Sequence, residues 1–375
     1  MVTKFVPSPA NSGGKLRSLA IARRLAKVSD EMVLCCFSDA TGDADALREL
    51  GIDVRTVPWQ PDLQHVVRGI ARTHTGSAGR FWDKGLAALV HEATREKPTD
   101  LLQVEYSQLA SYLSVGSARR KVLDFHNIES SLATSFAKSS KTLKGRLAYV
   151  EAPLLRRRER LGAEQADLVT VVSTKDAERM PGHPRELLVC PNGWEPTEQL
   201  PPSDEPTAVF VALMGWKPNI DAAVWLGRDV WPLVRARMPE ARLLLVGREP
   251  SAEVRALASD DIEVTGTVPD VRPYLARARV ALAPLRSGGG TRLKVLEALD
   301  AGRPIVSTTI GIEGLEDLVG DGALVADDAQ GFADRVVELL SDPERAAKAG
   351  DVGHETVAER YAWDRVLAPW LERIA

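Results

Sequence analysis

Cysteine and aromatic residues are scarce in this sequence, which has three cysteines among 375 residues and 5% Phe, Trp and Tyr. Three cysteines cannot form a disulfide framework. Cys35 and Cys36 are adjacent in the apolar run MVLCCF and lack the spacing of metal ligands. We therefore expect these two thiols, and Cys190, to be small core residues in a reducing cytoplasm.

Long apolar runs and a strong excess of charge are also missing. No run reaches the ~18 apolar residues of a membrane-spanning helix, and the N-terminus shows no apolar leader segment. The formal net charge of −4 gives no basis for expecting a nucleic acid partner. We expect a cytoplasmic protein, either free or held peripherally at the inner membrane surface.

Short apolar runs alternate with amphipathic helical stretches along the chain, and this alternation predicts the fold class. Many runs are continuous, which is typical of parallel strands covered on both faces. Repeated strand–helix units form doubly wound α/β sheets. The predicted strands are 2–6, 32–37, 54–57, 101–104, 121–125, 168–172, 187–189, 209–213, 242–246, 262–265, 280–283, 304–307 and 323–325.

The alternation restarts once, after the proline-rich and acidic stretch PNGWEPTEQLPPSDEPT at 191–207. This stretch is the predicted linker. It divides the chain into two Rossmann-like domains, 1–195 and 206–360, which would face each other across a cleft at the carboxyl ends of their strands. A last helical stretch over 361–375 is a candidate to return to the first domain.

The segment 138–160 is basic, with eight Lys or Arg residues and two glutamates, a local charge of +6. One hypothesis is a solvated helix face. The other is a patch that binds an anionic lipid or an anionic acceptor.

Two motifs of the first domain follow predicted strands. In PSPANSGGKLRS, residues 7–18, Gly13 and Gly14 would let the backbone approach a ligand, and the helix that follows would offer N–H groups to an anion. An ordinary strand–helix turn is the alternative. In VLDFHNIES, residues 122–130, His126 lies at a strand's carboxyl end and suits hydrogen bonding or proton exchange, although a structural histidine is common.

The second domain opens with FVALMGWKPN, in which Lys217 and Asn219 lie in the predicted loop after a strand. Lys217 could neutralise a phosphate, or could be an ordinary solvated lysine. A helix is predicted over 222–237, bent or interrupted at Pro232.

The segment 281–315 is the most informative. Three glycines follow a strand and precede a helix predicted over 291–301, which Thr291 could cap. Gly290, Lys294 and Glu297 would share one face of that helix. This face would present a phosphate cradle, a cation and a carboxylate that can accept ribose hydroxyls. The alternative is a surface ion pair.

Taken in order, these motifs resemble the GT-B glycosyltransferases, and in particular the retaining enzymes of glycosyltransferase family 4. The resemblance covers essentially the whole chain and rests on SGGK, HN after a strand, VCPNGW, FVALMGWKPN, VTGTVPDVRPYLARARVALAPL and GGGTRLKVLEALDAGRPIVST. It implies transfer of a sugar, with retention, from a nucleotide-diphosphate donor to an acceptor hydroxyl, without a separate cofactor. The implied acceptors are a small molecule, a polysaccharide or a lipid-linked glycan.

The resemblance also implies roles for individual residues. His126 would lie near the transferred sugar, Arg292 would lie beside the diphosphate, and Glu297 would hold the donor ribose. From charge alone, we expect Lys217 and Arg292 to stabilise the leaving diphosphate. The turn 266–270 would contact the base. The remaining donor contacts implied are Gly13, Gly14, Thr267, Val268, Gly289, Gly290 and Thr291. The shared helix face adds Lys294 as a donor contact.

Two positions depart from the family pattern. The family has a second glutamate eight positions before Glu297, where this sequence has Gly289, so the side chain that usually bonds the sugar hydroxyls is missing. An Arg and Lys pair is also expected near LMGWKPN, where Lys217 is the one cation. Arg292 and Lys294 are candidates for the remaining positive charge.

The expected mechanism follows from charge. Neither a pair of catalytic carboxylates nor a DxD metal motif at a strand end stands out in the sequence. We expect a metal-independent, front-face transfer in which the leaving phosphate helps to deprotonate the acceptor. A nucleotide-sugar epimerase on the same fold and a non-catalytic nucleotide-sugar binder are the alternatives.

Overall fold

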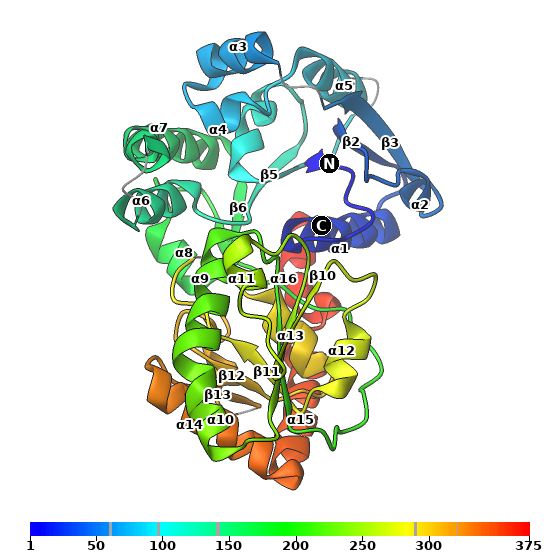
Figure 1. Ribbon diagram of the computed structural model, residues 1–375. Helices are drawn as coiled ribbons and strands as arrows, with labels where there is room; N and C mark the ends of the chain where they lie inside the picture. The colour runs from blue at the N-terminus through cyan, green and yellow to red at the C-terminus, as the bar shows by residue number, and fades with distance from the viewer. Residues whose placement is uncertain (60–61, 96–97, 140–142, 289–290, 321) are drawn as a thin grey trace. The chain divides into compact units, whose positions relative to one another are not determined.

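The computed structural model describes residues 1–59, 62–95, 98–139, 143–288, 291–320 and 322–375. These residues form two compact units (Figure 1). The first unit is Met1–Pro191 with Leu367–Ala375, and the second unit is Asn192–Val366. The strands of the described residues lie where the apolar runs predict them, so the α/β prediction is confirmed.

The first unit is built on a seven-stranded parallel sheet with the order β3-β2-β1-β4-β5-β6-β7. Its strands are β1 (Val2–Phe5), β2 (Met32–Ser38), β3 (Ile52–Pro58), β4 (Leu101–Glu105), β5 (Arg120–Phe125), β6 (Leu168–Val171) and β7 (Leu187–Val189). Its helices are α1 (Gly13–Val28), α2 (Asp45–Arg48), α3 (Leu63–Thr73), α4 (Gly76–Gly79), α5 (Lys84–Arg95), α6 (Glu129–Ser139), α7 (Leu143–Gln165) and α8 (Thr174–Arg179), with a 3₁₀ segment over Ser107–Ser114.

The second unit is built on a six-stranded parallel sheet with the order β10-β9-β8-β11-β12-β13. Its strands are β8 (Thr207–Val211), β9 (Arg242–Val246), β10 (Ile262–Gly266), β11 (Val280–Ala283), β12 (Ile305–Ser307) and β13 (Ala323–Val325). Its helices are α9 (Lys217–Trp225), α10 (Trp231–Arg237), α11 (Ala252–Arg255), α12 (Arg272–Arg277), α13 (Leu293–Asp300), α14 (Ala329–Ser341) and α15 (Pro343–Thr356), with a 3₁₀ turn over Glu316–Leu318 and a π-helical turn over Val357–Tyr361. The last helix, α16 (Trp363–Ile374), begins in the second unit and ends in the first.

The continuous apolar runs are explained by helices on both faces of each sheet. In β8, Ala208 and Phe210 pack on one side with α9, α10 and α14, while Val209 and Val211 pack on the other with α12 and α13. Successive side chains of a strand point to opposite faces, so both parities must be apolar. Cys35, Cys36 and Cys190 are buried, as expected for small core residues.

Two helix predictions need correction. The helix predicted over 222–237 begins earlier, at Lys217, and its irregularity is a π-helical turn at Leu226–Val230 that precedes Pro232. A proline ring clashes with the carbonyl four residues before it, which accounts for a break on that side. The helix predicted from Thr291 begins at Leu293 with Arg292 at its N-cap position, so Thr291 does not cap it.

The proline-rich stretch after Pro191 packs on the second unit. Asp300 of α13 accepts hydrogen bonds from Trp194 Nε1 at 3.0 Å and from the Thr197 backbone N–H at 3.1 Å. Arg272 of α12 donates to Thr197 Oγ1 at 2.7 Å. The division between the units therefore lies at the start of this stretch rather than within it.

Within the described residues, the helices are all too short or too polar to cross a membrane.

Candidate functional site

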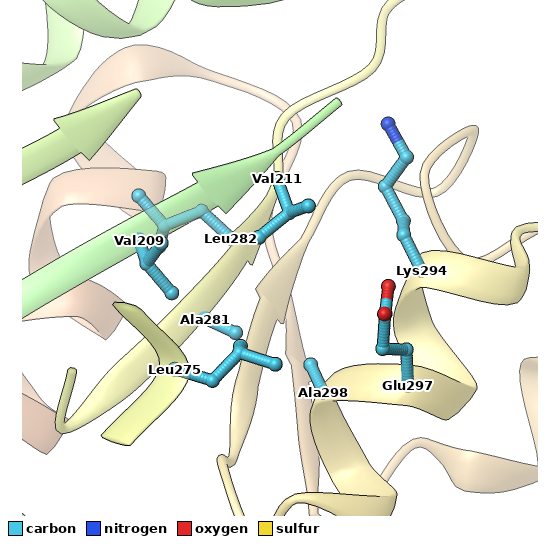
Figure 2. Close-up of a pocket in the computed structure, with 8 residues that line it drawn as sticks. All are labelled: Val209, Val211, Leu275, Ala281, Leu282, Lys294, Glu297 and Ala298. Carbon is cyan, nitrogen blue, oxygen red and sulfur yellow. The ribbon is translucent and has the colours of Figure 1, made fainter. Parts of the chain in front are cut away.

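In the second unit, α13 presents a cation and a carboxylate to one small pocket. Figure 2 shows Lys294 and Glu297 projecting from the same side of α13, with Val209 and Val211 of β8 across from them. The pocket is otherwise apolar, and its lining consists of Val209, Val211, Leu275, Ala281, Leu282, Lys294, Glu297 and Ala298. The predicted shared face of Lys294 and Glu297 is therefore present.

Lys294 is held in place by the segment that follows β8. Its Nζ donates to Asn219 Oδ1 at 3.1 Å and lies 4.8 Å from the centre of the Phe210 ring. Asn219 is itself anchored, because its Nδ2 donates to the Leu213 carbonyl at 2.9 Å. Burial, reinforced by the charge of Arg292, lowers the pKa of Lys294 to about 7.

The pKa of Glu297 is shifted in the opposite direction from that of Lys294. Burial raises its pKa to about 7; Lys294 opposes this rise, and Asp270 adds to it. Within the described part of the chain, the ammonium of Lys294 and the carboxylate of Glu297 form no ion pair. Two half-buried groups of opposite charge type, whose pKa values both lie at about 7, are suited to receive a polar ligand.

The predicted donor residues Thr267 and Val268 lie in the turn after β10. Thr267 is exposed and Val268 packs on the core, in the turn that follows β10 at Gly266, whose φ is +74°. The charges of Asp270 and Arg272, just beyond this turn, act on Glu297, so the turn and Glu297 belong to one neighbourhood.

Lys217 is exposed and is the first residue of α9, rather than a loop residue as predicted. Arg292 is buried, and burial lowers its pKa. The Thr291 hydroxyl is also buried, and among the described residues it has no hydrogen-bond partner. Gly289 and Gly290 lie outside the described residues.

In the first unit, Gly13 and Gly14 form the first turn of α1, where the prediction placed a tight turn before a helix. A Cβ atom on Gly14 would lie 2.5 Å from the hydroxyl oxygen of Tyr106, so only glycine fits there. Tyr106 follows β4 and has a φ of +70°, an uncommon backbone conformation for a residue with a side chain.

His126 follows β5 and is part of a buried ionic cluster. Its Nε2 lies 2.9 Å from Glu105 Oε2 and 3.2 Å from Asp124 Oδ2. Asp124 is also paired with Arg17, whose Nε and Nη2 donate to the two carboxylate oxygens at 2.6 and 2.8 Å. Burial would lower the pKa of His126, but the hydrogen bonds to Asp124 and Glu105 outweigh it and raise the pKa above its usual value.

Sequence reasoning found His126 but missed its partners. The available signals were an acidic residue at the end of one apolar strand, Glu105, and another inside the next, Asp124. Glu105, Asp124 and His126 offer ligand atoms within 4.8 Å of one another. Because Arg17 already engages both oxygens of Asp124, we interpret the group as an ion cluster rather than a metal centre.

Residues 205–342 match the family model described as "Glycosyl transferases group 1". The second unit therefore contains a group 1 glycosyltransferase domain.

Two curated relatives share sequence with this chain. A GDP-mannose-dependent alpha-(1-6)-phosphatidylinositol monomannoside mannosyltransferase of Mycobacterium tuberculosis is 30% identical over 185 residues, 44% of this chain and 46% of that protein. A phosphatidyl-myo-inositol mannosyltransferase of Mycolicibacterium smegmatis is 27% identical over 240 residues, 60% of this chain and 55% of that protein. The matched stretches thus span about half the length of these relatives.

The fold of the whole chain has solved counterparts. Sucrose-phosphate synthase from Thermosynechococcus elongatus superposes with a TM-score of 0.71 at 16% identity, covering 99% of this chain and 97% of that one. The predicted GT-B fold is therefore confirmed.

Proposed function

We propose that this protein transfers a sugar from a nucleotide-diphosphate sugar to an acceptor hydroxyl. The observation that carries the proposal is the pair Lys294 and Glu297 on α13, inside a group 1 glycosyltransferase domain. An ammonium suits a diphosphate oxygen, and a carboxylate suits the two hydroxyls of a ribose.

The proposed chemistry follows from how charge moves. Breaking the anomeric C–O bond leaves negative charge on the diphosphate and positive charge on the sugar ring. Cations placed in advance stabilise the diphosphate as its charge develops. We assign this role to Lys294 and Arg292, with Lys217 as an exposed third cation.

The donor is testable without knowing the acceptor. A ligand that binds only the folded state raises the thermal midpoint. We expect one class among UDP-, GDP-, dTDP- and ADP-sugars to raise it, and the names of the relatives make GDP-mannose the first candidate. Replacing Glu297 with alanine should reduce the shift at a fixed donor concentration. If no nucleotide sugar shifts the midpoint, the proposal is wrong.

Retention and metal independence are part of the proposal. We infer a front-face route in which the leaving diphosphate accepts the proton of the acceptor hydroxyl. Proton NMR of the fresh product should show the anomeric configuration of the donor, and chelation with EDTA should leave the rate unchanged. An inverted product or a rate restored by Mg²⁺ would contradict this part. Epimerised donor formed without an acceptor would favour the epimerase alternative instead.

We further propose that the acceptor is presented at an anionic membrane surface that contacts α7. This helix carries an exposed apolar stripe, in which Leu147, Val150 and Leu154 are 60, 67 and 43% exposed. Arg146 and Arg157, beside the stripe, are exposed as well. An apolar stripe flanked by arginines is typical of interfacial helices, and a purely solvated face does not explain it. Of the predicted basic segment, residues 140–142 lie outside the described residues.

Liposome sedimentation tests this surface. The protein should partition onto vesicles that contain anionic lipid and not onto neutral ones. Val150→Glu should reduce the bound fraction, whereas Val28→Glu, a change at a similarly exposed valine of α1, should not. If both variants partition equally onto the anionic vesicles, α7 does not contact the membrane surface.

A further inference from the structure

In the ionic cluster of the first unit, two carboxylates face His126, although one hydrogen-bond acceptor would be enough to hold a structural histidine. Asp124 and Glu105 are both fully buried, and both contact the same ring nitrogen of His126. Burying a charge is unfavourable unless an opposite charge or hydrogen bonds compensate it. Each of the two buried carboxylates therefore needs a cation or hydrogen bonds that compensate its charge.

Asp124 is compensated by Arg17. The guanidinium makes two parallel hydrogen bonds to the carboxylate, the strongest geometry for such a pair. Thr170 Oγ1 also donates to Asp124, and Arg17 Nη1 is fixed by the Cys190 carbonyl at 3.0 Å. Burial would raise the pKa of Asp124, but Arg17 holds it far below its usual range.

Among the residues that the structure describes, Glu105 forms its ion pair with His126. Gln103 Nε2 donates to Glu105 Oε1 at 2.8 Å, which leaves Oε2 to face the imidazole. An amide supplies no charge. Among the described residues, the charge of Glu105 is therefore matched by an imidazolium at His126, just as Asp124 is matched by Arg17.

The plane of the imidazole is also fixed. The Tyr106 ring stacks on His126 with centroids 3.8 Å apart and an angle of 27° between planes. Lys4 Nζ lies 4.1 Å from the centre of the same tyrosine ring. The ring of His126 is thus held by its edge and by its face.

We propose that Glu105 is a positioning residue of the transfer reaction, because it keeps His126 as an oriented imidazolium that donates hydrogen bonds and does not act as a base. This inference rests on the proposed function. If His126 is already protonated, it has no lone pair for the proton of the acceptor. The acceptor oxygen then bonds to the anomeric carbon, the C–O bond to the diphosphate breaks with its electron pair, and the proton passes to a leaving phosphate oxygen.

Several other charged or titratable groups face this cluster from the elements packed around it. They are the Met1 amino group, Lys4 of β1, Arg17 of α1, Tyr106 after β4, Asp124 of β5 and Cys190 after β7. Glu129 of α6 acts on Lys4.

The test is the titration of the His126 imidazole by NMR in the full chain, with His126→Gln to assign its signal among the six histidines. In the wild type we expect His126 to titrate above the usual value. Glu105→Gln should lower its midpoint by about 1–3 pH units, and Glu105→Asp should lower it less. Glu151→Gln, which removes one carboxylate of α7 in the same unit, should leave it unchanged.

The pH profile of turnover provides a second readout. If the imidazolium is the active form, kcat/KM falls as pH rises through the His126 midpoint, and Glu105→Gln moves this limb to lower pH. An imidazole that titrates at its ordinary value, or that responds equally to Glu105→Gln and Glu151→Gln, overturns the inference. The titration needs no turnover, so failure of every donor to react would instead overturn the proposed function.

Discussion

The first unit matches its buried charges at the ends of β4 and β5, with Arg17 on Asp124 and His126 on Glu105. In the second unit, Lys294 and Glu297 share one side of α13 and yet form no ion pair within the described residues. Their pKa values are both displaced to about 7. In the first unit, each buried carboxylate has a cationic partner, and the cluster stabilises the fold and orients the His126 ring. In the second unit, Lys294 and Glu297 do not pair with each other in the part of the chain that the structure describes, so both can interact with the charges and hydroxyls of a ligand. Mutations in the two units should therefore have different consequences.

The largest expected effect is on folding, in the first unit. Asp124→Asn leaves the Arg17 guanidinium buried without its counter-charge, which should cost about 3–5 kcal/mol of unfolding free energy. Urea denaturation of the full chain measures this cost. Asp270→Asn, a change at an exposed carboxylate, is the matched control and should have an effect below about 0.5 kcal/mol. Equal urea midpoints for the two variants would contradict the prediction that the charge of Asp124 stabilises the fold more than that of Asp270.

The next effect is on binding, in the second unit. Glu297→Ala removes the carboxylate that we assign to the ribose, and hydrogen bonds to charged groups are worth about 1.5–3 kcal/mol. The donor dissociation constant should therefore rise by roughly 10- to 100-fold, measured by calorimetry with the nucleotide sugar that stabilises the wild type. The unfolding free energy should fall little, since Glu297 has no ion-pair partner among the residues that the structure describes. If Glu297→Ala lowers the unfolding free energy but binds the donor with unchanged affinity, Glu297 has a structural role and does not hold the ribose.

The pH dependence of stability should also separate the two groups on α13. The pKa of Lys294 in the folded state, about 7, lies below its ordinary value, so the unfolded chain binds more protons between pH 7 and about 10. Lys294 therefore makes stability rise with pH in that window. Glu297, whose pKa is raised to about 7, makes stability fall as pH rises from about 4 to 7. In Lys294→Met the rise above pH 7 should be reduced, as urea unfolding at several pH values would show. Parallel curves for the variant and the wild type would contradict it.

The sequence predicts the strands well because parallel strands covered on both faces leave a continuous apolar signature, as in VFV of β8 and LLLV of β9. It also predicts that Lys294 and Glu297 share a face, because helical spacing alone decides this. It does not predict Arg17, which is separated from Asp124 by 107 positions, or Glu105, which precedes His126 by 21. Those pairings depend on strand order, since β4 and β5 become neighbours only in the folded sheet. Thr291 was assigned to a cap because threonine favours that position, but the helix begins two residues later, at Leu293.

The smallest effect concerns how Lys294 is aimed. Asn219→Ala removes the amide that accepts from Lys294 Nζ and is anchored to the Leu213 carbonyl. A single hydrogen bond is worth about 0.5–1.5 kcal/mol, so kcat/KM should fall by roughly 2- to 12-fold. The matched comparison is Lys217→Ala, which removes the whole charge of the exposed lysine two residues earlier. If Asn219→Ala costs more than Lys217→Ala, the buried lysine of α13 is the main cation for the diphosphate. The opposite order would make Lys217 the main cation for the diphosphate, and the charge of Lys294 would then serve to balance that of Glu297.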